Sequence, residues 1–139
     1  MENKFINTAV EYFKSGCSCS ESIVKTAISF GLAPESLFQV STVFSGGMGS
    51  GCLCGAVAGA QIVIGSIYGK ESRPYAKQFI DKFKEIHKAT CCRVLTAKYK
   101  DFHSPERKLH CHDMVSSAAK ILYDMVKDKI KIEELSENI

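Results

Sequence analysis

The chain has 139 residues, a length typical of one domain, so we expect a single cysteine-rich domain over residues 1–139. Hydrophobic residues make up 45% and charged residues 24%, which argues against a disordered, collagen-like or coiled-coil chain. The net charge of +3 is spread along the sequence without a basic block, so we expect no nucleic-acid partner. Seven cysteines are the unusual feature of this composition.

The N-terminal segment shows no pattern of a secretory signal peptide, because Glu11 and Lys14 interrupt its apolar residues. We therefore expect a cytoplasmic protein, and in that compartment close cysteine spacings indicate metal binding or thiol chemistry more often than structural disulfides. The apolar run of residues 52–68 is near the lower length limit for a membrane span and contains Gln61. We expect this run to form a buried helix and the protein to have no membrane partner.

Apolar residues at spacings of three and four predict an amphipathic first helix over residues 3–14. Ser18 and Glu21, three residues apart, match a capping box, which predicts that a second helix begins at Cys19. Gly31 is a suitable residue just beyond the end of that helix.

Pro34 suits the first position of a third helix, which we expect to run to Phe44. Residues 45–51 are rich in glycine and are predicted to form an irregular loop. Glycine then recurs at every fourth position, at Gly51, Gly55 and Gly59. These three residues, which we call the glycine ridge, lie on one side of a predicted helix that runs to about Tyr68. Because glycine inside a helix is unfavourable by about 1 kcal/mol relative to alanine, the glycine ridge indicates that a backbone or bulky group packs very close to this helix.

Three more helices are predicted downstream. The fifth begins near Pro74, and its apolar positions are Tyr75, Phe79, Phe83 and Ile86. Thr90 is a suitable cap for a short sixth helix that includes Cys91, Cys92, Leu95 and Tyr99. Ser104 and Pro105 start the last helix, whose apolar face carries Cys111, Val115, Ala118, Leu122 and Val126. No alternating strand pattern occurs, so we predict an all-α single-domain bundle of about six to seven helices, with a Gly-rich loop before a central Gly/Ala-rich helix.

Six of the seven cysteines come in close pairs, which are Cys17 with Cys19, Cys52 with Cys54, and Cys91 with Cys92. Each pair is predicted at the start of a helix, with Ser18, Ser50 and Thr90 as the expected caps. A helix N-terminus favours a thiolate, so such cysteines are suited to reactivity or to metal binding. Cys111 should point toward the interior, where a lone cysteine is more often a small buried hydrophobe than a ligand. No Cys-x-x-Cys spacing occurs, which argues against a thioredoxin-type dithiol and a zinc ribbon.

The histidines give weaker evidence for a functional site than the cysteines do. His110 and His112 flank Cys111, but residues two apart on a helix point about 200° away from each other, so both cannot join Cys111 at one metal ion. We expect them, like His103, to face solvent. His87 is predicted to be a favourable charge partner at the C-terminus of a helix.

The glycine-rich loop has two interpretations. Its N–H groups could bind a phosphate, but no strand precedes it, and neither a P-loop nor a Rossmann fingerprint is present. We prefer the interpretation in which this backbone wraps an iron–sulfur core and donates N–H bonds to its sulfides. The candidate residues for this contact are Gly46, Gly47, Gly49 and Gly55.

The sequence CGAVAG at residues 54–59, preceded by FSGGMG at residues 44–49, resembles the signature of the small redox-active proteins named for their C_GCAxxG_C_C cysteine pattern. The resemblance spans nearly the whole chain and implies a redox role without a settled reaction. The residues that resemble the four cysteine positions of that family are Cys19, Cys54, Cys92 and Cys111. This chain adds Cys17, Cys52 and Cys91 beside three of them, which suggests either a larger cluster or spare exchange ligands.

Two hypotheses follow. In the first, the protein binds an iron–sulfur cluster and carries electrons to or from a redox partner protein. The cluster ligands are Cys19, Cys54, Cys92 and Cys111, with Cys17, Cys52 and Cys91 as auxiliary candidates. In the second, the protein is a metal-free thiol/disulfide oxidoreductase in which Cys54 or Cys92, with a low pKa at a helix start, attacks an oxidant or a disulfide. A zinc-binding module is a third alternative, although zinc would not need seven thiols. The glycine ridge equally suits a homodimer contact.

Overall fold

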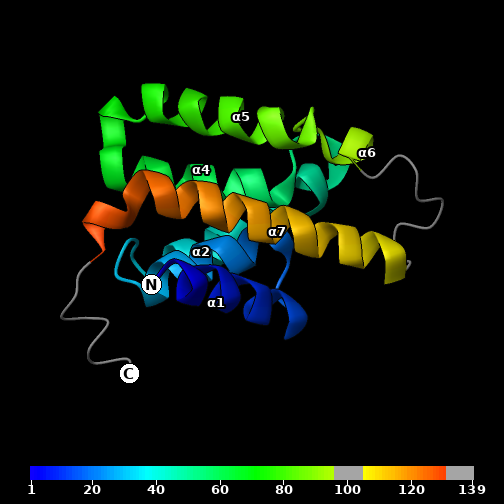
Figure 1. The fold of residues 1–139 in the computed structure, drawn as a ribbon, viewed down its shortest axis with the longest axis horizontal. Coiled ribbons are helices and arrows are strands. Elements are labelled where there is room, and N and C mark those ends of the chain that lie inside the picture. Colours follow the sequence, from blue (N-terminus) through cyan, green and yellow to red (C-terminus); the bar gives the residue numbers. More distant parts are fainter. Residues whose placement is uncertain (96–104, 131–139) are drawn as a thin grey trace.

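The structure is a computed structural model, and it describes residues 1–95 and 105–130. Within these residues the chain forms helices, one isolated β-bridge and no strand, which confirms the predicted all-α fold (Figure 1). The α-helices are α1 (Glu2–Lys14), α2 (Cys19–Ser29), α3 (Leu37–Ser41), α4 (Gly55–Tyr68), α5 (Arg73–His87), α6 (Cys92–Leu95) and α7 (Pro105–Val126). The shorter turns are η1 (Thr42–Phe44), η2 (Gly47–Gly51), η3 (Gly69–Glu71) and η4 (Lys127–Lys129). None of the described helices combines the length and the apolar character that crossing a bilayer requires.

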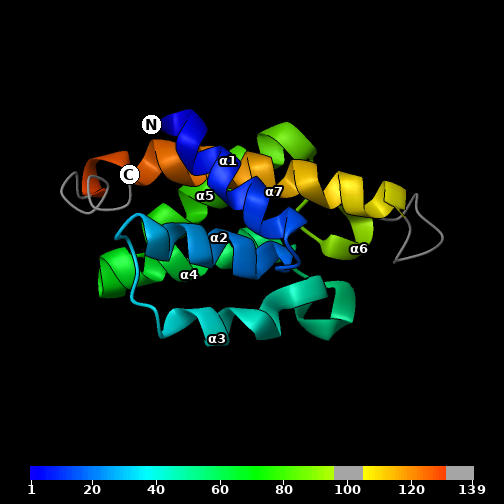
Figure 2. The same cartoon turned by 90° about the horizontal axis from the view of Figure 1, so that it is seen from below.

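Helix α2 is central to the bundle. It packs against α1, α3, α4 and α7, and Figure 2 shows it between α1 on one side and α3 and α4 on the other. Helix α5 packs on α4 and α7 (Figure 1). The apolar residues of each long helix therefore face a common interior.

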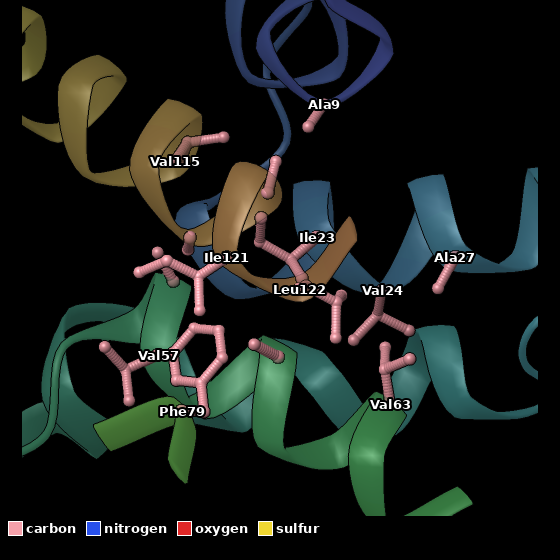
Figure 3. Packing of buried hydrophobic residues seen from close by; sticks show 14 of the residues in the cluster. Ala9, Ile23, Val24, Ala27, Val57, Val63, Phe79, Val115, Ile121 and Leu122 are labelled. Atoms are coloured by element: carbon pink, nitrogen blue, oxygen red, sulfur yellow. The ribbon is translucent and has the colours of Figure 1, made fainter. Parts of the chain in front are cut away.

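The hydrophobic core contains side chains from all the long helices. Among those at most 1% exposed are Phe5 of α1, Ile23 of α2, Val63 of α4, Phe79 of α5 and Leu122 of α7. Figure 3 shows the side chains of Ile23, Leu122 and Phe79 in one packed cluster. Full burial of a side chain of this size contributes about 1.5–3 kcal/mol to the free energy of unfolding. The predicted apolar face of the last helix is confirmed, since its members are all buried, namely Cys111, Val115, Ala118, Leu122 and Val126.

Helices α2 and α4 approach each other through glycine. A Cβ atom on Gly59 would lie 2.8 Å from the carbonyl oxygen of Ser20, and one on Gly55 would lie 3.2 Å from the Cβ atom of Cys19. Glycine is the residue that permits such a close approach of two backbones. The close packing predicted from the glycine spacing is confirmed at these two positions. Gly51 is different, because it lies in η2, before the helix begins.

The beginning of α2 agrees with the prediction from the sequence. The Ser18 hydroxyl oxygen accepts the backbone N–H of Glu21 at 3.2 Å, and the Glu21 carboxylate accepts the backbone N–H of Ser18 at 2.8 Å. Gly31 follows the helix with a φ of 74°, a conformation that glycine adopts readily at this position. The predicted capping box is therefore confirmed.

The predicted start of the third helix is wrong. Helix α3 begins at Leu37, not at Pro34. The carbonyl of Pro34 accepts the N–H of Leu37 at 3.1 Å, so the proline belongs to a turn that precedes the helix. Helix α5 begins at Arg73, with Pro74 in its first turn, as predicted. The predictions for Tyr99, His103 and Ser104 fall on residues outside the described part of the chain.

Candidate functional site

The segments that carry cysteines meet at one end of the bundle. Helices α2 and α4 start at this end, α6 lies there, and the N-terminal half of α7 reaches it (Figures 1 and 2). The four cysteines concerned are Cys19, the first residue of α2; Cys54, the N-cap of α4; Cys92, the first residue of α6; and Cys111, in the second turn of α7. The topology thus gathers residues that are up to 92 positions apart in the sequence, from Cys19 to Cys111.

The glycine-rich segment is an irregular turn, as predicted. Its backbone has positive φ angles at Gly46, Gly47, Met48, Gly49 and Gly51. The carbonyl of Gly47 accepts the N–H of Cys52 at 3.3 Å, which closes the turn. A Cβ atom on Gly47 would lie 2.5 Å from the backbone nitrogen of Cys52, so this position combines a left-handed backbone with space for glycine alone. The turn therefore fixes the backbone position of Cys52.

Two short segments pair directly after this turn, and we call residues 52–54 and 90–92 together the cysteine clip. Leu53 and Cys91 form the isolated antiparallel bridge. On one side of the bridge the N–H of Cys54 donates to the carbonyl of Thr90 at 2.7 Å, and on the other the N–H of Cys92 donates to the carbonyl of Cys52. The clip holds the start of α4 against the start of α6.

The clip explains why two predicted caps are wrong. Helix α4 is capped at Cys54, whose carbonyl accepts the N–H of Ala58, while the Ser50 hydroxyl donates to the carbonyl of Gly47 within the turn. Helix α6 begins at Cys92, so Cys91 rather than Thr90 immediately precedes it. Ser50 belongs instead to the glycine-rich turn, and Thr90 belongs to the cysteine clip.

Three cysteines, which we call the inner thiols, are buried together. Cys54, Cys92 and Cys111 are only 5–6% exposed. They come from α4, α6 and α7, and they lie close enough for Cys92 and Cys111 to raise the pKa of the Cys54 thiol by charge repulsion. The fold therefore brings three of the four cysteines in the first hypothesis into one buried neighbourhood.

The prediction that Cys54 has a low pKa is wrong. The pKa of its thiol is raised to about 11, mainly by burial and to a smaller extent by the neighbouring thiols of Cys92 and Cys111. The backbone N–H groups of Val57 and Ala56 favour the thiolate, as expected at a helix start, but their effect is smaller than the cost of burial. The Cys54 thiol therefore keeps its proton at neutral pH in the metal-free protein.

Cys19 lies at the edge of this neighbourhood. It is half-buried, and its Cβ atom is 3.2 Å from where a Cβ atom on Gly55 would be. Gly55 is the residue that follows Cys54, so the absence of a side chain at Gly55 lets α2 bring Cys19 beside the start of α4.

The remaining cysteines, Cys17, Cys52 and Cys91, are more accessible, and we call them the outer thiols. Cys52 is exposed, whereas Cys17 and Cys91 are half-buried. The Ser50 hydroxyl donates to the sulfur of Cys52 at 3.0 Å, and the thiol of Cys91 donates to the carbonyl of Gly51 at 3.2 Å. Each outer thiol is one or two residues from an inner thiol or from Cys19, but it has a different environment.

A cluster of serines, which was not predicted from the sequence, attaches the glycine-rich turn to α2. The Ser45 hydroxyl donates to that of Ser18 at 2.7 Å, and the buried Ser20 hydroxyl donates to the carbonyl of Ser41 at 2.7 Å. The Thr42 hydroxyl donates to the Glu21 carboxylate at 2.6 Å. The repeated serines at residues 18, 20 and 22 were the available signal, since small polar side chains on a helix start suit a buried hydrogen-bonded contact.

The predicted surroundings of His87, His110 and His112 are wrong. His110 and His112 are half-buried and do not simply face solvent. The His87 ring lies 4.6 Å from that of Phe83, and burial together with the nearby His110 lowers the pKa of His87. A lowered pKa disfavours the positive charge that a helix C-terminus would attract. Packing against α7 therefore outweighs the helix dipole here.

Among the described residues, no three Cys, His, Asp or Glu side chains are arranged so that they could hold one metal ion. The inner thiols with Cys19 nevertheless supply the donor type that iron–sulfur clusters use, which is cysteine sulfur. A cluster places several iron and sulfide atoms between its cysteines, so its ligands stand farther apart than those around one ion. The sulfur atoms of these four cysteines are therefore chemically suited to bind an iron–sulfur cluster.

One family matches most of the chain. The family described as "Putative redox-active protein (C_GCAxxG_C_C)" matches residues 17–125, a range that contains all seven cysteines. No curated protein and no solved structure matches the chain. The match agrees with the resemblance noted from residues 44–49 and 54–59.

Proposed function

This chain belongs to the redox-active C_GCAxxG_C_C family, and we propose that its inner thiols together with Cys19 bind an iron–sulfur cluster through which the protein carries electrons. The observation that carries this proposal is the burial of Cys54, Cys92 and Cys111 in one neighbourhood, although they come from three different helices. Such a gathering has no evident value for packing alone, because aliphatic side chains would fill the same space.

The energetics of burial support a bound metal group. Thiolates that leave water without compensation cost several kcal/mol each. Iron offsets this charge, so a cluster makes it possible for the inner thiols to be ionised and buried at once. When bound, the cluster supplies one-electron chemistry; the protein residues position it and limit its contact with water.

The backbone around the site favours negative charge. Cys54 and Cys19 stand at the starts of α4 and α2, where the partial positive charge of the helix N-terminus is directed at them. We propose further that the N–H groups of Gly46, Gly47, Gly49 and Gly55 donate to the cluster. In this proposal the polar backbone of the irregular turn covers the side of the cluster that α2, α6 and α7 do not cover.

The proposal also includes the compartment and the partner of the protein. We propose a cytoplasmic electron carrier that exchanges electrons with a redox partner protein. The glycine ridge is not proposed as a dimer contact, since Gly55 and Gly59 already pack against α2 of the same chain.

Anaerobic reconstitution tests the proposal. The full chain is incubated with iron, sulfide and a thiol reductant without air, and then desalted. We expect bound iron and sulfide and a visible charge-transfer absorption band. Cys111→Ser should lose most of the bound iron, whereas the matched control Cys17→Ser should keep it. A colourless wild-type protein without iron, or equal loading in both variants, would contradict the proposal.

A further inference from the structure

We infer that Cys52 and Cys92 form a dithiol/disulfide pair that exchanges with low-molecular-weight disulfides. The register of the cysteine clip leads to this pair. The bridge between Leu53 and Cys91 is flanked by two backbone hydrogen bonds, one of which runs from Cys92 to Cys52. In an antiparallel pair with this register, the residues on either side of the bridge are opposite each other, so Cys52 faces Cys92 across the clip.

One backbone hydrogen bond, from the Cys92 N–H to the Cys52 carbonyl, joins the two residues, while the Cys52 N–H donates to the carbonyl of Gly47. In antiparallel pairs the Cα atoms of opposite residues are about 4.5–5.5 Å apart, which is inside the range of about 4.4–6.8 Å found for disulfides. The other nearby combinations are less suitable. Cys91 and Cys92 are adjacent and could form only a strained vicinal bridge. The Cys54 thiol lies near that of Cys92, but both are buried, so this combination has no exposed thiol to meet a small disulfide from solvent.

Accessibility assigns different roles to the two thiols. Cys52 is exposed, and the Ser50 hydroxyl donates to its sulfur at 3.0 Å, which orients that sulfur at the surface. Cys92 is 6% exposed and is reached from solvent less easily. Cys52 is therefore the thiol that meets an incoming disulfide, and Cys92 is the thiol that resolves the product.

The exchange balances in two steps. The Cys52 thiolate attacks one sulfur of the small disulfide RSSR, so that a Cys52–SR bond forms, the S–S bond of RSSR breaks, and RS⁻ leaves. The Cys92 thiolate then attacks the sulfur of Cys52, the Cys52–SR bond breaks, and a second RS⁻ leaves. In total the two cysteines lose two protons and two electrons, and RSSR becomes two RSH.

The pair also has a consequence for the proposed cluster. A sulfur in a disulfide cannot coordinate iron, so oxidation of Cys52 and Cys92 would remove one inner thiol from the centre. This regulatory consequence depends on the proposed function, whereas the disulfide itself does not. The exchange would thus couple the thiol redox state around the protein to cluster loading.

Intact mass spectrometry of the metal-free chain with glutathione disulfide tests the pair. We expect the wild-type chain to lose the mass of two hydrogen atoms. Cys92→Ser should instead gain one glutathionyl group on Cys52, because the resolving thiol is absent. The variant Cys52→Ser, which changes an exposed side chain outside the core, should form no Cys-to-Cys link between the two segments of the clip.

Tryptic digestion then identifies the partners. Cleavage after Lys25, Lys70, Lys88 and Arg93 places Cys52 in peptide 26–70 and Cys92 in peptide 89–93. These peptides should be linked in the wild type and in the matched control Cys91→Ser, and separate in Cys52→Ser and Cys92→Ser. A link that survives in Cys92→Ser, or a wild-type chain that is only glutathionylated, would overturn the inference. Neither result depends on iron loading, so the pair and the cluster can fail separately.

Discussion

Cys52 and Cys54 are separated by a single residue, yet Cys52 is exposed and Cys54 is 5% exposed beside Cys92 and Cys111. The difference arises in the backbone. Cys52 ends a left-handed glycine turn, whereas Cys54 caps α4, which packs against α2. Position at a helix start therefore does not decide the chemistry of a thiol by itself, because burial can exceed the effect of the helix dipole.

Alkylation should show the largest contrast between the two thiols. Because the pKa of Cys54 is raised to about 11, about 0.1% of it is ionised at pH 8, compared with about a quarter of an ordinary thiol. We expect iodoacetamide to modify Cys54 more than about 100-fold more slowly in the metal-free folded chain than in the urea-unfolded chain. Peptide mass spectrometry over time measures both rates, and Cys52 should change much less.

The pH dependence sharpens this test. The rate at Cys54 in the folded chain should rise about tenfold for each pH unit from pH 8 toward pH 11, since the reactive thiolate is the minor form throughout. A rate that levels off near pH 9 would show that burial does not hold the proton on Cys54.

Helices α2 and α4 pack closely along the helix that Cys54 caps, so disturbing their contact should weaken the contrast. Gly59→Ala places a Cβ atom 2.8 Å from the Ser20 carbonyl oxygen, and we expect it to lower the free energy of unfolding by about 1–3 kcal/mol. Gly65→Ala is the matched control in the same helix, because no atom lies within 4 Å of the new Cβ. It should be neutral or stabilising by up to about 1 kcal/mol. Urea unfolding of both variants measures the difference, and equal effects would contradict the proposed close packing.

The cap of α2 should have a smaller effect. Ser18→Ala removes the hydrogen bond from the Glu21 N–H and the one from Ser45, and the loss of a cap costs about 1 kcal/mol. Thermal unfolding gives the stability, and the iron bound after reconstitution shows whether Cys19 depends on the cap. An unchanged melting temperature would mean that the serine cluster does not hold the turn on α2.

Replacing Glu21 should change the free energy of unfolding least, and this change should depend on pH. The backbone N–H of Ser18 and the Thr42 hydroxyl lower the pKa of this carboxyl, so its stabilisation is present above its ordinary pKa and is lost as pH falls through the lowered value. We expect Glu21→Gln to be less stable than the wild type at pH 7, with a difference that shrinks below about pH 4. Denaturant titrations at several pH values measure it, and a constant difference would contradict the assignment.

The parts of this fold that the sequence predicts are those that depend on near neighbours in the chain. The capping box joins Ser18 to Glu21, three residues away, and its residue types specify it. The glycine at residue 59 also predicted a close approach, because an unfavourable residue inside a helix requires compensation. It did not reveal that the neighbour is Ser20 of α2.

The parts that the sequence does not predict depend on residues far apart. Ser50 and Thr90 both have the composition of a helix cap, but the glycine turn uses the Ser50 hydroxyl, and the clip uses the Thr90 carbonyl. Likewise, the low pKa expected for Cys54 follows from the helix start alone, whereas its burial and the nearby thiols of Cys92 and Cys111 depend on residues far away in the chain. Such contacts have no signature in a single sequence.

X-ray absorption at the iron edge tests the central claim most directly, because it identifies the atoms around the metal. The sample is the triple variant Cys17→Ser, Cys52→Ser, Cys91→Ser, reconstituted without air, so that only Cys19 and the inner thiols can supply cysteine sulfur. We predict a first shell of sulfur and a second shell that contains iron. A first shell of oxygen or nitrogen alone, or no bound iron in this variant, would contradict the claim that the inner thiols form the redox centre.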